Sequence, residues 1–133
     1  MDEQLRRFVR QRAGNRCEYC RLRQEHDRFR PLHIEHIIAR QHRGSDEADN
    51  LALACHQCNL HKGTNFSSFD PDTDEVARLY HPRRDRWPDH FRLDGPTIIG
   101  ITPTGRTTAW LLQMNSDERL EWRRVLLALG ELD

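Results

Sequence analysis

The sequence predicts an α+β fold organised around a four-cysteine metal site. Three features of the 133 residues support this prediction: two Cys-x-x-Cys pairs, a strand-like apolar segment at 32–39, and amphipathic segments near both ends. Hydrophobic residues make up only 36% of the chain, so its core is small. A bound metal is a common source of stability for such a small core.

In the first half, residues 4–13 place Leu5, Phe8 and Val9 at helical spacing, and Gly14 follows as a helix end. Residues 21–31 are polar and rich in arginine, which predicts a loop. Isoleucines at 34, 37 and 38 predict a strand over 32–39, and 44–49 form a turn. A short helix is expected from the second Cys-x-x-Cys pair to Lys62, with Gly63 ending it.

In the second half, 65–75 are loop-like and 76–93 show no clear period. The stretch 81–87 combines residue types that bind phosphates and stack on bases, although a surface loop pinned by Trp87 and Phe91 is the preferred interpretation. A strand is predicted at 97–102, as one arm of a hairpin, and a helix at 107–114. A last helix is expected to start after Ser116 and to end before Gly130, with four apolar residues on a face expected to pack in the core: Trp122, Val125, Leu126 and Leu129.

The composition changes after residue 64, and we expect a core at 1–66 and an extension at 67–133 that packs on it in a single compact domain. No apolar run reaches the ~18–20 residues that span a bilayer, and the first residues lack the apolar centre of a signal peptide. We therefore expect a cytoplasmic protein without a membrane partner. In that compartment cysteines serve more often as metal ligands than in disulfides.

The two Cys-x-x-Cys pairs, Cys17/Cys20 and Cys55/Cys58, use every cysteine of the chain. Each pair directs two thiolates at one ion, and four thiolates form the closed tetrahedral site of a structural zinc. The 34 residues between the pairs exceed a usual zinc-ribbon spacing, so a folded insertion is expected there. The alternative is four unrelated reduced cysteines.

The insertion contains His33-Ile34-Glu35-His36 and then Asp49-Asn50-Leu51, and Asn59 follows the last cysteine. In this order and spacing, with the flanking cysteines, residues 17–64 resemble the HNH endonuclease family. The resemblance implies a ββα-metal core, in which a β-hairpin and a following helix hold one divalent ion and cut a phosphodiester bond.

The resemblance implies a catalytic role for Glu35, His36, Asn50 and Asn59. His36 is the expected general base, because imidazole titrates near neutral pH. Glu35 and Asn59 are the expected ligands of a catalytic Mg²⁺ or Mn²⁺, which prefers oxygen ligands. Asn50 is expected to tie its loop to the backbone and so fix the surroundings of His36.

Three features depart from the commoner family pattern: Glu35 replaces Asp, Asn59 replaces His, and Ala39 replaces Pro. Adjacent residues of a regular strand also point to opposite faces, so Glu35 and His36 need a bulge or a strand end to reach one ion. His33 and His61 are possible accessory groups, with solvated or supporting positions as the alternative. Lys62 is expected to contact a phosphate.

The leading functional prediction is metal-dependent hydrolysis of DNA, with RNA as a further substrate that the residues do not exclude. The alternative is a catalytically silent zinc module that binds nucleic acid. The sequence leaves the oligomeric state open, although a homodimer would allow one site per strand. The net charge is zero, but residues 5–30 hold nine arginines against three acidic residues. Arginine suits phosphate contacts, although its content also follows genomic base composition.

Overall fold

The computed structural model describes residues 1–132 and divides them into two compact units. The first unit comprises 1–66 and 81–85, and the second comprises 67–80 and the described residues from 86 onward. That the second unit packs on the first in a single domain stays a prediction.

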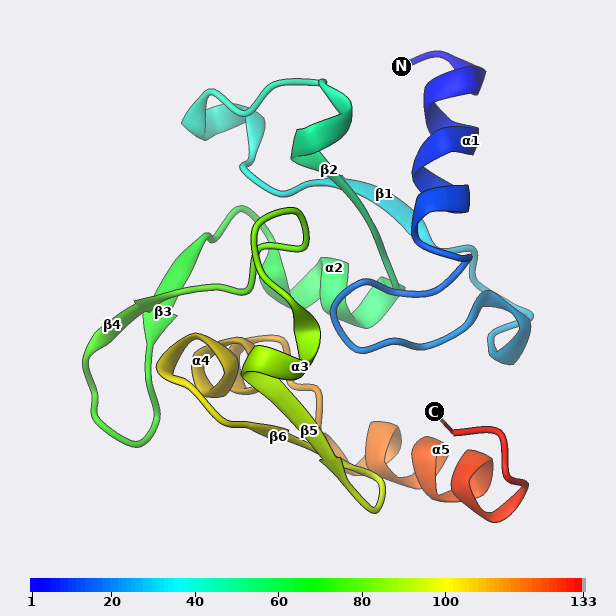
Figure 1. The fold of residues 1–133 in the computed structure, drawn as a ribbon, viewed down its shortest axis with the longest axis vertical. Coiled ribbons are helices and arrows are strands. Elements are labelled where there is room, and N and C mark those ends of the chain that lie inside the picture. The colour runs from blue at the N-terminus through cyan, green and yellow to red at the C-terminus, as the bar shows by residue number, and fades with distance from the viewer. Residues whose placement is uncertain (133) are drawn as a thin grey trace. The chain divides into compact units, whose positions relative to one another are not determined.

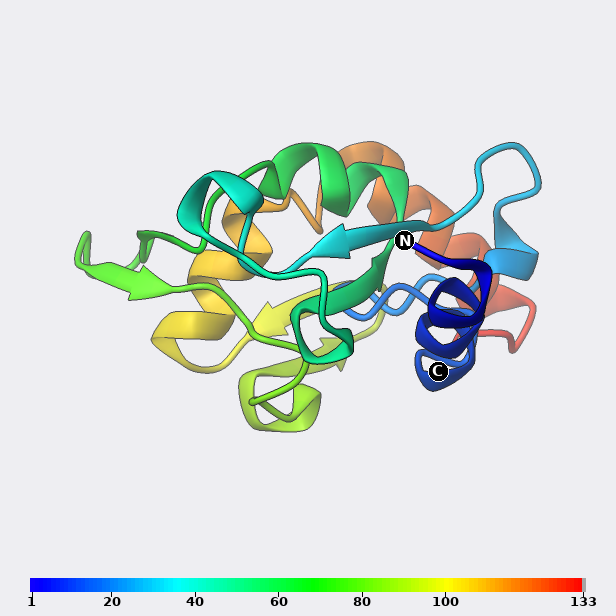
Figure 2. The same cartoon turned by 90° about the horizontal axis from the view of Figure 1, so that it is seen from above.

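The first unit is built on an antiparallel hairpin of β1 (His33–His36) and β2 (Leu51–Ala54). Helices α1 (Glu3–Arg12) and α2 (His56–Lys62) both contact this hairpin (Figures 1 and 2). All four residues of β2 are buried, and Val9 of α1 and Leu32 complete the apolar centre. Asp2 caps α1 by accepting the Leu5 N–H at 2.8 Å, as expected of an N-cap carboxylate.

Three short 3-10 helices lie in the connecting segments of the first unit: η1 (Gln24–His26), η2 (Arg40–His42) and η3 (Ala48–Asn50). The predicted strand at 32–39 is shorter in the structure. Its ladder ends after His36 because the next residues bond to Asn50: Ile37 donates to the Asn50 backbone carbonyl and Ile38 to its side chain.

The segment 81–85 belongs to the first unit because Arg83 forms an ion pair with Glu18 of the first cysteine pair. Glu18 also accepts the Leu53 N–H at 2.8 Å, which joins this segment to β2. Burial and the charge of Arg12 lower the pKa of Arg83 to about 10.

The second unit contains two further hairpins and three helices. The hairpins are β3 (Ser67–Phe69) with β4 (Val76–Arg78), and β5 (Phe91–Asp94) with β6 (Thr97–Gly100); the helices are α3 (Trp87–His90), α4 (Pro103–Leu111) and α5 (Asp117–Ala128). Helix α4 contacts β3, β4 and β6, and close backbone approach requires glycine at two positions. A Cβ at Gly105 would lie 2.0 Å from the His90 carbonyl oxygen, and one at Gly100 would lie 2.3 Å from the Arg106 nitrogen.

Several expectations for the second unit were wrong. A hairpin, β3–β4, replaces the expected loop at 65–75, and α4 begins at Pro103 rather than at 107. The Thr102 hydroxyl caps α4 by accepting the Gly105 N–H at 3.0 Å, and proline suits the first helical position.

The hairpin arm at 97–102 is confirmed as β6, although it ends at Gly100. Trp87 and Phe91 pack together with ring centroids 5.0 Å apart, as the pinned-loop interpretation expected.

The apolar face expected on α5 does not pack in the core. Leu126 is buried, but Trp122, Val125 and Leu129 are exposed. The helix instead buries Arg119 and Arg123. Arg119 donates to the Leu112 carbonyl at 2.9 Å, and Arg123 donates to the carbonyls of Met114 and Pro96. These charged hydrogen bonds satisfy carbonyl groups at helix and turn ends, and they turn the apolar face outward.

Candidate metal and catalytic sites

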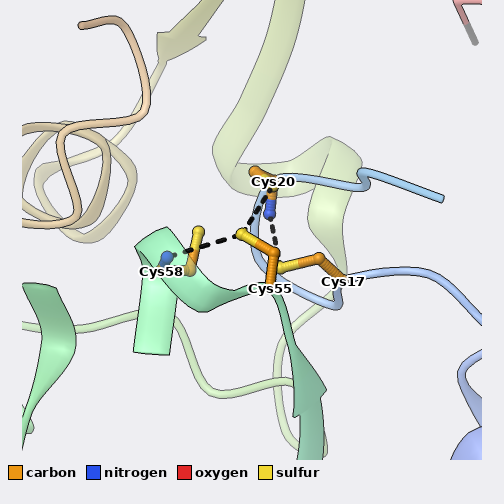
Figure 3. Close-up of side chains that lie close together, drawn as sticks. All are labelled: Cys17, Cys20, Cys55 and Cys58. Carbon is orange, nitrogen blue, oxygen red and sulfur yellow. Dashed lines mark hydrogen bonds between the residues drawn. The ribbon is translucent and has the colours of Figure 1, made fainter. Parts of the chain in front are cut away.

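The four cysteines form one buried cluster. Cys17 and Cys20 lie between α1 and η1, whereas Cys55 and Cys58 lie at the start of α2 (Figure 3). Their sulfur atoms all lie within 4.8 Å of one another, and the Cys20 and Cys55 sulfurs are 3.6 Å apart. Four sulfurs around a tetrahedral zinc with Zn–S bonds of about 2.3 Å are separated by roughly 3.8 Å, so the cluster fits zinc in both number and spacing.

Local backbone geometry turns the sulfurs inward. The Cys20 N–H points to the Cys17 sulfur and the Cys58 N–H to the Cys55 sulfur, each at 3.4 Å (Figure 3). Burial raises the pKa of the Cys17 and Cys58 thiols well above the ordinary value. Thiolates at this position therefore require a bound cation, which zinc would supply. The expected four-cysteine cluster is thus present in the structure.

Strand β1 carries Glu35 and His36 in a regular ladder. Each residue faces one partner, Glu35 opposite Ala52 and His36 opposite Leu51. The bulge that would turn both side chains toward one ion is absent from β1. The two side chains therefore enter different surroundings, as strand geometry requires.

Glu35 is directed into the protein, with only 7% of its surface exposed. One carboxylate oxygen accepts the Tyr19 hydroxyl, and the other lies 3.1 Å from the Lys62 Nζ atom. Burial raises the pKa of Glu35, while the Lys62 charge and the Tyr19 hydroxyl act in the opposite direction. Because the Lys62 ammonium lies 3.1 Å away and both side chains are buried, the carboxylate is part of a buried ion pair.

Lys62 is 1% exposed, so the expected phosphate contact of Lys62 is not met. Its ammonium group donates to the backbone carbonyls of Ile37 at 3.0 Å and His36 at 3.3 Å, in addition to pairing with Glu35. Lys62 is buried because the Glu35 carboxylate lies inside the protein, where an unpaired charge is costly, and Lys62 is the cation within reach of it. Lys62 thereby ties α2 to the end of β1.

His36 lies at the end of β1 with its side chain about one-fifth exposed. Its Nε2 atom is 2.7 Å from the Asp46 Oδ1 atom, and Asp46 also accepts from Arg40 Nη2 at 3.0 Å. The hydrogen bond from His36 is the largest contribution lowering the pKa of Asp46, which favours the ionised carboxylate. An ionised carboxylate only accepts, so Nε2 carries the proton and Nδ1 of a neutral imidazole holds the free electron pair.

The loop that presents Asp46 is fixed by the Asn50 side chain. Its Oδ1 atom accepts the Ile38 N–H at 2.9 Å, and its Nδ2 atom donates to the carbonyls of Ile38 at 3.0 Å and Ser45 at 2.8 Å. Gly44 allows the loop to close, because a Cβ there would lie 1.6 Å from the Ile38 oxygen. These contacts are the ones expected of a residue that ties the loop to the backbone.

The remaining predicted residues lie on α2 and at the start of β1. Asn59 is half-buried in the middle of α2, and His61 is half-buried in its last turn. The rings of His33 and His56 lie 5.8 Å apart. Within residues 1–132, the cysteine cluster is the one group of three or more His, Cys, Asp or Glu side chains close enough to hold an ion. The catalytic-ion assignment therefore depends on Asn59 and on Glu35, whose carboxylate is already paired.

Sequence reasoning missed Tyr19, Asp46 and Arg40. Asp46 is one of several acidic residues in its loop, and its neighbours in the sequence do not distinguish it. Tyr19 lies between the cysteines of the first pair, and its contact with Glu35 joins positions 16 residues apart. No local pattern predicts either contact.

Residues 17–65 match the family model described as HNH endonuclease. This segment is an HNH domain. It covers a little over a third of the chain and includes all four cysteines, β1, β2 and α2. The resemblance inferred from the sequence is therefore confirmed for this domain.

Over most of its length, the chain is also similar to the Septu protein PtuB of Bacillus thuringiensis, with 25% identity over 123 residues. That alignment covers 91% of this chain but 45% of the relative, so the chain spans less than half of that protein's length. No solved structure matches the chain. Among residues 1–132, no helix has the length and apolar character needed to cross a membrane.

Proposed function

We propose that the HNH domain is a metal-dependent endonuclease that hydrolyses DNA phosphodiester bonds, with His36 as the general base. The His36–Asp46 pair is the observation that carries this proposal. Asp46 accepts a hydrogen bond from Nε2, which leaves Nδ1 to take a proton from the attacking water. The pair lies at the end of β1, where the His36 side chain remains partly open to solvent.

Asn50 contributes to the same reaction by positioning. Its three side-chain hydrogen bonds hold the turn from Ile38 to Ser45, and this turn delivers Asp46 to the imidazole. Positioning of this kind reduces the reorganisation needed to reach the transition state. In this proposal β1, β2 and α2 form the ββα-metal core, since a hairpin followed by a helix is the order that the family resemblance implies.

Asn59 and Glu35 remain the proposed ligands of a catalytic Mg²⁺ or Mn²⁺. The ion would stabilise negative charge on the phosphate and on the leaving oxygen. The amide oxygen of Asn59 is a suitable hard donor on a half-buried helix position. Glu35 can accept the ion only if it gives up or shares its contact with Lys62, which makes its role the weaker of the two.

The Glu35 assignment has its own test in Lys62→Met, which frees one carboxylate oxygen. If Glu35 binds the ion, Mn²⁺ should bind the variant more tightly than the wild type at a pH above the raised pKa of the carboxyl group that has lost Lys62. Electron paramagnetic resonance of Mn²⁺ would measure the affinity. Unchanged or weaker binding by a folded variant would leave Glu35 as a buried partner of Lys62 and remove it from the ligand set.

The function as a whole is tested by cleavage of supercoiled plasmid. Wild type and His36→Ala are freed of loosely held metal by brief chelation and incubated with Mg²⁺ or Mn²⁺. His42→Ala is the matched control, because this exposed histidine lies in the same loop and its ring contacts Phe66. Zinc content and thermal unfolding verify that all three proteins are folded.

We expect nicking or linearisation by wild type and His42→Ala and loss of both products with His36→Ala. Removing a general base lowers the rate by about 10²–10⁴-fold. Equal cleavage by all three proteins would contradict the assignment of His36. Absence of cleavage by the zinc-loaded wild type would favour a silent module that binds nucleic acid, or RNA as substrate.

A further inference from the structure

Phe29 is the most exposed large apolar side chain of the described residues. It is 95% exposed, whereas Phe8, Phe66 and Phe69 are 48% to 55% exposed. It lies at the tip of the segment 27–31, with the sequence Asp-Arg-Phe-Arg-Pro, which we name the Phe29 loop. An aromatic ring held in water leaves a large apolar surface available to a partner.

Hydrogen bonds hold the Phe29 loop in this conformation. The Asp27 carboxylate accepts the N–H groups of Phe29 at 3.2 Å and Arg30 at 3.1 Å. Gln24 closes the base of the loop, since its amide donates to the carbonyls of Asp27 at 2.9 Å and Arg30 at 3.2 Å. The same side chain accepts the Leu32 N–H at 2.7 Å. The ring is therefore presented by a braced loop, which lowers the entropic cost of binding.

The charges around the ring select the class of partner. Arg28 and Arg30 flank Phe29 in the sequence, and both are exposed. The first 30 residues also contain most of the basic charge of the HNH side of the chain, with arginines that outnumber acidic residues threefold from 5 to 30. An exposed ring whose sequence neighbours are two exposed arginines suits a nucleobase with its adjacent phosphates, because every base has a π-face and every linkage is anionic.

We propose that the Phe29 loop is a nucleobase-stacking site, in which Phe29 stacks on an unpaired base and Arg28 and Arg30 contact the adjacent phosphates. The proposal rests on nucleic acid as the substrate of the HNH domain. Phe29 and His36 are seven residues apart, so their backbones lie within about 25 Å. With at least 3.4 Å between successive phosphates, a strand of about seven nucleotides can reach from the loop to His36.

Binding of a fluorescein-labelled single-stranded DNA oligonucleotide tests the proposal, measured by anisotropy with the zinc-loaded full chain in the absence of Mg²⁺. Phe29→Ala should weaken binding by about fivefold to a hundredfold, the range found for one base–aromatic stack. Phe29→Trp should retain affinity, whereas Phe29→Leu should not, because leucine keeps an apolar side chain without the π-face. Phe69→Ala is the matched control, since Phe69 is half-exposed in the second unit between Ser68 and Asp70.

Two further probes separate stacking from charge. An oligonucleotide of abasic sites keeps the phosphates but lacks the bases, so wild type and Phe29→Ala should bind it equally. Replacing Arg28 and Arg30 by Gln should lower the slope of log affinity against log salt by roughly 0.7 for each phosphate that is no longer neutralised. Equal weakening of binding to the abasic probe by Phe29→Ala, or binding by Phe29→Ala equal to that of wild type, would overturn the stacking site.

The outcome is independent of the cleavage result. A Phe29-dependent affinity in a protein that does not cut DNA would support the stacking site and contradict the proposed nuclease. Cleavage by His36 with an affinity unaffected by Phe29→Ala would support the nuclease and overturn the stacking site.

Discussion

The buried pair of Glu35 and Lys62 gives the sharpest test of the structure. Lys62→Met replaces the ammonium group by an apolar side chain of similar length. The variant leaves a carboxylate that is 7% exposed without its cation, and it leaves the Ile37 carbonyl without its donor. Removing one partner of a buried ion pair costs about 3–5 kcal/mol, and we expect a loss in that range.

The loss should depend on pH with a definite sign. Burial raises the pKa of Glu35, and the Lys62 charge acts against that rise. Without Lys62 the folded protein holds a proton on Glu35 that the unfolded chain releases above its ordinary pKa of 4.5. The free energy of unfolding of Lys62→Met, relative to wild type, should therefore fall as the pH rises from the ordinary pKa of 4.5 up to the raised pKa of Glu35 in the variant.

A second substitution distinguishes loss of charge pairing from simple loss of packing. Glu35→Leu combined with Lys62→Met replaces the pair by apolar groups, which is often close to neutral in a buried site. We expect the double variant to regain much of the stability lost by Lys62→Met. Loss of the Glu35 acceptor by the Tyr19 hydroxyl and of the Lys62 donor by the Ile37 carbonyl would each retain a penalty of about 1–3 kcal/mol. Adding Tyr19→Phe should remove the first of these.

Urea unfolding at a constant excess of zinc measures these differences, because bound zinc contributes to the apparent stability and must be held fixed. Arg124→Met is a matched control: Arg124 pairs with Glu121 at 3.1 Å, but both side chains are exposed. Such surface pairs contribute about 0–1 kcal/mol. A cost for Lys62→Met as small as that of the control would refute the buried pair and would place Lys62 at the surface, as the sequence alone suggested.

Three other predictions concern the base, the zinc and the second unit. Asp46→Ala should lower kcat by about tenfold to a hundredfold with KM unchanged, because Asp46 holds the imidazole of His36. In a His36→Ala background the same substitution should have no further effect, and additive losses would contradict a role of Asp46 through His36. Removal of zinc by a strong chelator should unfold the HNH domain, which circular dichroism would follow. Adding zinc back should restore the fold and release protons from the thiols, which calorimetry in buffers of different ionisation enthalpy would measure. Arg106 donates two hydrogen bonds to the Asp70 carboxylate, at 2.8 and 3.1 Å, and this contact lowers the pKa of Asp70 below its ordinary value of 3.8. The stability that the contact contributes is therefore present above pH 3.8 and is lost as the pH falls through the lowered pKa. Asp70→Asn should remove this part of the acid dependence, and an unchanged acid transition would refute the contact.

Local patterns were sufficient for several parts of the fold. The Cys-x-x-Cys pairs specify which sulfurs converge, because two intervening residues place both on one side of a turn. The role expected for Asn50 came from the resemblance to the HNH family rather than from a local pattern, and its side chain does bond to the backbone of Ile38 and Ser45. Helices α1 and α5 were predicted close to their observed bounds from capping residues and periodicity.

Short polar strands could not be predicted in the same way. Ser67–Phe69 and Val76–Arg78 have three residues each, too few to show a period in the sequence, so the hairpin depends on pairing and on contacts with α4. The orientation of α5 was also decided by packing. Its apolar residues at 122, 125 and 129 share a helical face, but carbonyl groups elsewhere in the second unit bind Arg119 and Arg123, and the adjacent face that carries these arginines is buried instead.

The sequence by itself determined the chemistry that is available: four thiolates for zinc, an imidazole at position 36, and oxygen donors at 35 and 59. Only the tertiary structure decided how these groups are used. Alternation along β1 turns Glu35 inward to Tyr19 and Lys62 and turns His36 toward Asp46. The reason is that the state of an ionisable side chain depends on its burial and on the charges facing it, and these neighbours come from segments far apart in the chain.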